Sequence, residues 1–287
     1  MGIITTAFVK QFGSNVEQLV QQKGSRLRAA CRIESGITGE EAYFDQLGAT
    51  AAVQKTTRNA DTPLIKSDHQ RRRVSMYDYE WADLIDKEDR LKMLIDPESS
   101  YATSAAWAMG RAIDDSLIAS LNGTAYTGKA GGTAVVLPGG QKIVVGAAGL
   151  TIAKLVEAKE ILDLADCDPD EPRYIAVSPK QISDLLATTE VTSADYNMVR
   201  ALVQGKVNSY MGFEFIISNR LAVDGSADRL CPVWVKSGLL LGIAQDIKSE
   251  IDRRSDKSYA TQVYLCMGIG STRMEEDKIV QIACNEP

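Results

Sequence analysis

Residues 96–123, DPESSYATSAAWAMGRAIDDSLIASLNG, constrain the fold more than any other stretch of the sequence. Asp96 is a suitable helix N-cap, Pro97 fits the first helical position, and Asn122-Gly123 is typical of a helix end. Between these signals, apolar side chains recur with the helical period at Tyr101, Ala105, Ala108, Met109, Ala112, Ile113, Ile118 and Leu121. The stretch predicts one helix of about 25 residues, roughly 38 Å long, with an alanine-rich face that another element packs against closely.

The segments before this helix have too few apolar residues to form a core of their own. Residues 14–24 predict a short helix between a Ser14 cap and Gly24. From Tyr43 to Trp81 the pattern changes to extended pieces at 51–53, 63–65 and 74–81, separated by polar residues. Because an isolated hairpin is barely stable in water, we expect this excursion to rest on a neighbour.

The remainder of the chain alternates helices and strands. Thr151 caps a predicted helix that runs to about Leu164, and Ser178-Pro179 begins another. Apolar runs and alternating patterns predict strands at 142–145, 173–177, 212–217, 233–235, 263–273 and 279–283. This order predicts an α+β fold with antiparallel pairs at the end of the chain.

The composition excludes several classes of protein. The 287 residues carry 32 Lys+Arg and 38 Asp+Glu, a formal net charge of −6, with 45% hydrophobic residues, which is the balance of a folded domain. The longest nearly apolar run, Ile143 to Ala153, is too short to cross a bilayer, so we expect a soluble intracellular chain without membrane contact. The 5 scattered cysteines predict free thiols, and a single histidine, His69, disfavours a histidine-based hydrolase. We expect no catalytic residue, no metal and no cofactor.

Two short motifs resemble ligand sites without completing them. Gly123 to Lys129 is one residue short of a phosphate-binding loop, because Ala130 stands where Ser or Thr would bind Mg²⁺. Residues 166–170 match the first half of a calcium loop, but the required Gly and Glu do not follow. We interpret the first as a flexible turn and the second as a polar loop.

Charge is unevenly distributed along the chain. Residues 1–73 hold 11 basic and 7 acidic side chains, whereas residues 74–100 hold 3 and 8. This split suggests contacts within the chain or between its copies, and solvated faces without a partner are an equally weighted alternative. The acidic balance disfavours nucleic-acid binding through bulk charge. The candidate inter-subunit contact residues are Arg71, Arg72, Arg73, Asp78, Glu80 and Asp83.

Several segments together resemble a known family. They are Leu94-Ile-Asp-Pro97, Leu150-Thr-Ile-Ala-Lys-Leu155, Arg173-Tyr-Ile-Ala-Val-Ser-Pro179, Gly212-Phe-Glu-Phe-Ile-Ile-Ser218 and the strand from Val263 to Arg273. In this order and spacing, over residues 14–284, the chain resembles the major capsid proteins of tailed bacteriophages, which have the Hong Kong 97-type fold. The resemblance implies an N-terminal arm (1–46), an extended β-hairpin loop (47–83), a peripheral domain with a spine helix at 97–121 (84–165 and 233–273) and an axial domain (166–232 and 274–287).

The resemblance also implies a function and a set of partners. Such proteins form hexamers and pentamers that tile an icosahedral shell around double-stranded DNA, without sequence-specific contact to it. The implied partners are the chain itself, a portal protein at one vertex, a scaffolding protein and a decoration protein. The implied location is the virion capsid, assembled in the cytoplasm of the bacterial host.

Departures from the family pattern lead to two further expectations. Because Met1 directly precedes the arm, we expect a separate scaffolding protein and no N-terminal cleavage. Lys55 and Lys66 have no assignable asparagine partner or activating glutamate, so no crosslink is expected. Two alternatives remain open, an encapsulin-like nanocompartment shell and a nucleotide-binding enzyme that uses residues 123–129.

Overall fold

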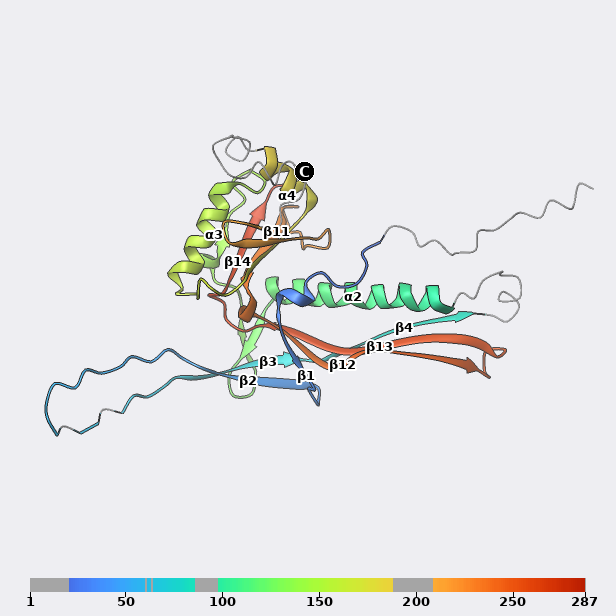
Figure 1. Cartoon of the computed structure of the whole chain (residues 1–287), viewed down its shortest axis with the longest axis horizontal. Coiled ribbons are helices and arrows are strands. Elements are labelled where there is room, and N and C mark those ends of the chain that lie inside the picture. The colour runs from blue at the N-terminus through green and yellow to red at the C-terminus, as the bar shows by residue number, and fades with distance from the viewer. Residues whose placement is uncertain (1–20, 60, 63, 86–97, 188–208, 287) are drawn as a thin grey trace, which may run out of the picture. The chain divides into compact units, whose positions relative to one another are not determined.

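The computed structural model describes residues 21–59, 61–62, 64–85, 98–187 and 209–286 (Figure 1). The chain divides into two compact units. The first comprises Met1–Ser25, Asp78–Ala112 and Asp246–Met267, and the second comprises Arg26–Tyr77, Ile113–Gln245 and Gly268–Pro287. The elements that contribute residues to both units include α2 (Glu98–Asn122), β12 (Leu239–Arg254) and β13 (Ala260–Arg273).

The predicted long helix is confirmed as α2, and five of the eight residues of its predicted apolar stripe are buried. Ala105, Met109, Ile113, Ile118 and Leu121 are all buried, as is Leu117, which lies on the same side. The stripe faces inward because these residues recur every three or four positions along the helix.

The C-terminal end of α2 is capped by a distant side chain. Arg273 is fully buried, and its guanidinium donates hydrogen bonds to the carbonyl oxygens of Ser120 (3.4 Å), Leu121 (3.2 Å) and Gly123. A cation is favourable here because the last carbonyls of a helix have no partner within the helix and carry partial negative charge. Burial nevertheless lowers the pKa of Arg273.

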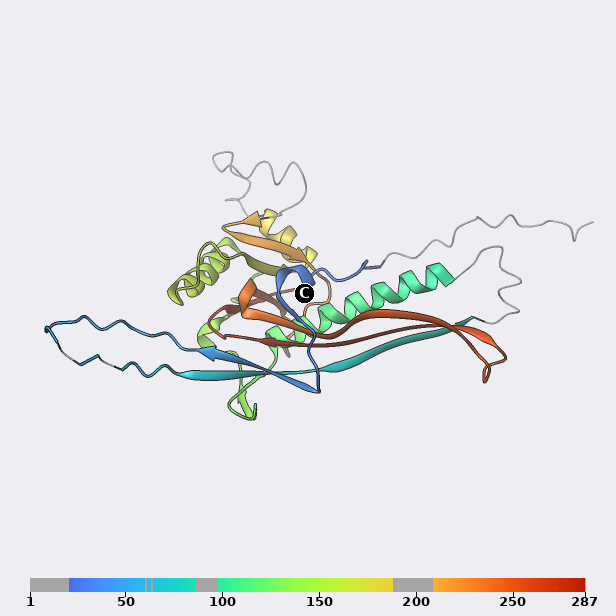
Figure 2. The same cartoon turned by 60° about the horizontal axis from the view of Figure 1, so that its bottom comes forward.

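In the first unit, the N-terminal part of α2 lies alongside β4 (Tyr77–Ile85) and β13 (Figures 1 and 2). Gly24 and Ser25 cross this helix at Gly110, where a Cβ atom would lie 2.5 Å from the carbonyl carbon of Gly24. Arg111 fixes the crossing by donating hydrogen bonds to Gln21 Oε1 (3.0 Å) and to the carbonyl oxygen of Gln22 (3.1 Å). Glycine is therefore required at position 110 by the close approach of two backbones.

The second unit contains a six-stranded sheet in the order β7-β14-β11-β8-β10-β9. Its strands are β7 (Lys142–Ile143), β8 (Arg173–Val177), β9 (Ser209–Tyr210), β10 (Phe213–Ile217), β11 (Arg229–Val235) and β14 (Ile279–Cys284). β8 pairs parallel with β10, whereas β11 is antiparallel to both β8 and β14. The central strands read as continuous apolar runs because both of their faces are buried. Helix α3 (Ile152–Leu164) packs against β14, and α4 (Pro179–Ala187) follows β8.

Two more sheets complete the fold. One has the order β2-β3-β5-β6, formed by β2 (Glu41–Leu47), β3 (His69–Ser75), β5 (Ala125–Thr127) and β6 (Thr133–Val135). The other has the order β1-β12-β13-β4, in which β1 (Arg32–Ser35) pairs with Leu240–Ile243 of β12. Short 3-10 turns lie at Arg28–Ala30, Gly139–Gln141 and Lys236–Gly238.

Most of the predicted elements are confirmed, and three differ. The Thr151 cap of α3 is present, as are α4, β8, β10 and β14, and none of the five cysteines, all of which lie in the described ranges, forms a disulfide. The expected strand at 74–81 is two strands that break at Met76, and the extended pieces expected at 51–53 and 63–65 are not strands in the described residues, which exclude residue 63. Residues 14–20 of the expected first helix lie outside the described residues, and residues 21–24 are not helical.

The sheet topology bears on the predicted domain boundaries. β7 and β11 belong to the same sheet as β8, β10 and β14. The predicted boundary at 165/166, however, assigns β7 and α3 to the peripheral domain, and the predicted boundary at 232/233 falls within β11. The division into arm, extended loop, peripheral domain and axial domain stays a prediction.

The buried stripe of α2 leads to a test of the core. Ile113 is 2% exposed, so Ile113→Ala should lower the free energy of unfolding of the subunit by about 2–5 kcal/mol. Leu164→Ala is the matched control, because Leu164 is 78% exposed and its truncation creates no cavity. Urea unfolding of both variants measures the difference, and a loss below about 1 kcal/mol for Ile113→Ala would contradict the buried packing.

The end of the chain is held by one carboxylate. Glu286 accepts hydrogen bonds from Ser178 Oγ (2.9 Å), Arg229 Nε (2.9 Å) and Gln181 Nε2 (3.4 Å). Burial opposes ionisation of Glu286, but these hydrogen bonds outweigh it and lower the pKa of the carboxyl group.

A lowered pKa in the folded chain makes stability depend on pH in a defined direction. The stabilisation from Glu286 is fully present above the carboxyl pKa of the unfolded chain, about 4.3, and is lost as the pH falls through the lower folded value. Urea unfolding between pH 3 and 6 should show a shallower loss of stability for Glu286→Gln than for the unmodified chain. Equal slopes for the two proteins would contradict this role.

Candidate functional site

The β2–β3 hairpin places the three consecutive arginines on opposite faces of a sheet. In the antiparallel register, Tyr43 pairs with Arg73, Phe44 with Arg72 and Asp45 with Arg71. Because successive side chains of a strand alternate between faces, Arg72 points to one side and Arg71 and Arg73 to the other.

Arg72 is buried and paired within its own chain. Its side chain is 3% exposed, and its two terminal nitrogens donate to the two carboxylate oxygens of Glu276 at 3.0 and 2.9 Å. Its Nε donates to the carbonyl oxygen of Met274 at 3.0 Å. Val74, on the same face of β3, packs with Leu240 and Met274. A two-pronged pair in these surroundings fixes the geometry of the hairpin base.

Arg71 and Arg73 lie on the opposite, more open face. Arg71 Nε is 2.6 Å from Asp45 Oδ1, and Arg73 Nη1 is 3.0 Å from Glu41 Oε1. The hydrogen bond from Arg71 lowers the pKa of Asp45. The Arg73 guanidinium also lies 4.6 Å from the ring centre of Tyr126 on β5. This face is therefore a layer of paired charges and aromatic rings.

The three candidate acidic residues belong to β4. Asp78 and Glu80 are exposed and Asp83 is half-buried. The Tyr264 hydroxyl donates to Glu80 Oε1 at 3.0 Å, and this hydrogen bond raises the pKa of Tyr264 to about 12. The Asp83 carboxylate accepts a hydrogen bond from the Leu84 backbone amide at 2.8 Å. Pairing of these acids with arginines of a neighbouring subunit stays a prediction.

The chain between β2 and β3 is an extended, exposed segment. Residues 48–68, here called the extended segment, leave and rejoin the hairpin at one point, where the Gly48 amide donates to the Asp68 carbonyl oxygen at 2.8 Å. Apolar side chains are exposed along it, with Leu64 at 93% and Val53 at 60%. In the described part of the chain, Lys55, Arg58 and Lys66 form no ion pair. The described residues of this segment therefore leave apolar side chains open to solvent.

Sequence reasoning missed two contributors to this site. The first is Glu276, because nothing local in the sequence connects it to Arg72, which is 204 positions away. The second is Tyr43, whose ring lies against Arg71. Its position could be predicted, because Tyr43 is two residues from Glu41 and from Asp45 and therefore lies on the same face of the strand.

The near-miss phosphate loop has another structure. Ala125–Thr127 is strand β5, Gly128 adopts φ +98°, and the next element is strand β6. A phosphate-binding loop instead leads directly into a helix, so residues 123–129 do not form one. In the described ranges no group of three or more His, Cys, Asp or Glu side chains is placed to hold a metal ion. No helix within those ranges is long and apolar enough to cross a membrane.

The burial of Arg72 makes a charge reversal at this position a test of the hairpin base. Arg72→Glu alone should destabilise the subunit by about 3–5 kcal/mol, because it places a second carboxylate against half-buried Glu276. Arg71→Glu, the matched control on the open face, should cost less than about 1 kcal/mol. Urea unfolding of the unassembled subunit compares them, and equal effects would contradict the buried pair.

Comparisons with known proteins agree with this architecture. The sequence profile of a family described as phage capsid protein matches residues 4–286. The fold is similar to the capsid structure of cyanophage P-SCSP1u, with a TM-score of 0.76, 18% identity and coverage of 98% of this chain and 94% of that one. It is also similar to the capsid of Ralstonia phage GP4, with a TM-score of 0.76, 10% identity and coverage of 100% and 98%.

A third similar structure is the acid-stable capsid of Helicobacter pylori bacteriophage KHP30, with a TM-score of 0.73, 10% identity and coverage of 99% and 97%. A search of curated protein sequences finds no match. The family profile spans nearly the whole chain, and the described fold has the expected α+β order of a Hong Kong 97-type subunit. The chain belongs to the phage capsid protein family and is a structural shell protein, not an enzyme.

Proposed function

We propose that this capsid protein assembles as hexamers and pentamers into an icosahedral shell around double-stranded DNA, and that each extended segment lies over a neighbouring subunit. The observation that carries the proposal is the exposure of this segment in a chain of the phage capsid protein family. Its apolar side chains lose contact with water only if another molecule covers them. In a shell built from one subunit, a second copy is the partner present at every position.

The contact residues of this proposal follow from exposure. Asp78 and Glu80 are proposed as contact residues because both are exposed on β4. Arg71 and Arg73 lie on the open face of the hairpin, where a second carboxylate can approach. Arg72 contributes indirectly, since its pair with Glu276 holds the hairpin base from which the extended segment leaves.

The other partners are proposed from the family resemblance. They are a scaffolding protein, a portal protein at one vertex, a decoration protein and the packaged DNA, with assembly in the cytoplasm of the host. The formal charge of −6 supports contact with DNA that is weak and independent of sequence. An encapsulin-like shell is the second candidate, and the molecules that co-purify inside the particles discriminate between cargo enzymes and a genome.

Assembly is tested first on the purified chain. Light scattering and negative-stain images should show rings, tubes or closed shells, because the exposed apolar surface favours self-association. A chain that remains a 31.2 kDa monomer and binds ATP would contradict the shell proposal.

A second measurement isolates the extended segment. Replacing residues 49–67 by a short Gly-Ser turn should leave the unfolding transition within about 1 kcal/mol of the unmodified subunit, because Gly48 and Asp68 are already joined. The same variant should fail to form closed shells. Normal shells from this folded variant would show that the segment makes no essential contact between copies.

A further inference from the structure

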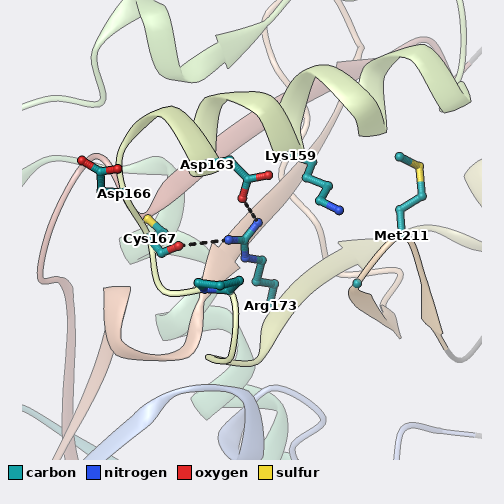
Figure 3. A pocket seen from close by; sticks show the side chains of 8 residues that line it. Lys159, Asp163, Asp166, Cys167, Arg173 and Met211 are labelled. Atoms are coloured by element: carbon teal, nitrogen blue, oxygen red, sulfur yellow. Dashed lines mark hydrogen bonds and ion pairs between the residues drawn. The ribbon is translucent and has the colours of Figure 1, made fainter.

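A pocket outside the hairpin is not accounted for by shell assembly. It has a volume of about 460 Å³ and lies between α3, the loop that leads to β8, and the β9–β10 turn (Figure 3). Its lining residues are Lys159, Asp163, Asp166, Cys167, Pro169, Arg173, Met211 and Gly212, all within the second unit. Two of these side chains, Lys159 and Arg173, are cationic, and each has a hydrogen-bond donor without an acceptor among the described residues.

Arg173 lines this pocket with one donor unused. The residue is 5% exposed, its Nη1 donates to Asp163 Oδ1 at 2.7 Å, and its Nη2 donates to the Cys167 carbonyl oxygen at 3.2 Å. Its buried Nε–H has no acceptor among the described residues. A buried donor without an acceptor is unfavourable, so Arg173 gains from a side-chain shift that brings an acceptor to its Nε.

Lys159 supplies a second positive charge. In the described part of the chain its ammonium group takes part in no ion pair, although Asp163 lies one helical turn away. Figure 3 shows Lys159 and Arg173 on the same side of α3, with Asp166 beyond Cys167 on the far side. Asp163 is neutralised by Arg173, so the end of the pocket near Lys159 keeps an uncompensated positive charge.

The wall opposite Lys159 leaves room for a ligand. Met211 and Gly212 form the tight turn between β9 and β10, with φ values of +53° and +87°. No atom lies within 4 Å of the position that a Cβ atom would take on Gly212. Positive φ at both central residues is typical of a two-residue hairpin turn, and the pairing of Tyr210 with Phe213 on either side sets the position of this wall.

We propose that this pocket binds a single oxyanion, a carboxylate or a phosphate group, between the Lys159 ammonium and the Arg173 guanidinium. Lys159 can offer an N–H to the ligand directly, whereas Arg173 contributes its positive charge, and its Nε–H once the side chain shifts. Asp163 limits the affinity by competing for Arg173. The oxyanion has two possible sources, a free inorganic anion or a carboxylate side chain of a second copy of the chain. Only the second source depends on the shell assembly proposed above.

The first experiment uses inorganic phosphate and the unassembled subunit. Thermal unfolding is followed at pH 7.5 against phosphate concentration, with sodium chloride at equal ionic strength as the reference. Lys159→Gln should weaken the apparent affinity for phosphate at least tenfold. Lys180→Gln, which changes an exposed lysine on α4, should leave it unchanged. Asp163→Asn should increase the phosphate-induced shift, because it frees Arg173, an effect that general salt stabilisation would not produce.

The second experiment uses assembled particles made from a mixture of isotopically light and heavy subunits. Carbodiimide joins lysines to adjacent carboxylates, and mass spectrometry of mixed-isotope peptides identifies bonds between copies. A crosslink from Lys159 to a carboxylate of another copy assigns the site to a subunit contact. A phosphate shift that depends on Lys159, without that crosslink, assigns it to a free anion. Identical phosphate responses in all variants, together with no crosslink at Lys159 between copies, overturn the proposal.

Discussion

One carboxylate, Glu276, lies between two buried arginines, and the hairpin that carries the extended segment depends on it. Both of its oxygens accept hydrogen bonds from Arg72, and its Oε1 is 3.9 Å from Arg273 Nε. Arg273 in turn holds the last carbonyls of α2 and the Val135 carbonyl oxygen (3.0 Å) at the end of β6. A single cluster therefore joins the hairpin base, the end of the long helix and the loop between β13 and β14.

Such a cluster contributes more to defining one geometry than to overall stability. Removing charges from water costs several kcal/mol per ion, and the attraction within the cluster offsets that cost only when the geometry is good. With two guanidinium groups and one carboxylate the local charge is positive, so the carbonyl oxygens around Arg273 are needed as additional acceptors. An apolar cluster of similar volume would hold these elements together with less control over the direction of the hairpin.

The elements that could be predicted from sequence are those with local signals. The N-cap at Thr151, the stripe along α2 and the apolar runs of β8 and β14 all lie within a few residues of the element they define. The strand β12 was missed because its outer half, from Ala244 to Arg254, shows no alternation of apolar and polar residues. The partner of Arg72 and the sheet membership of β11 are set by contacts between distant parts of the chain, which no local pattern encodes. The proposed oxyanion pocket could not be predicted for the same reason, since α3 and the β9–β10 turn come together only in the folded unit.

The crossing at Gly110 shows how little space separates two parts of the first unit. A Cβ atom there would lie 2.6 Å from the backbone nitrogen of Ser25, closer than carbon and nitrogen atoms approach without bonding. Because glycine has a hydrogen atom where other residues have a Cβ atom, Gly24 and Ser25 can lie directly against the helix at this point. Any larger side chain at position 110 would push Gly24 and Ser25 away from the helix. The identity of this one residue decides whether Gly24 and Ser25 can lie against the helix.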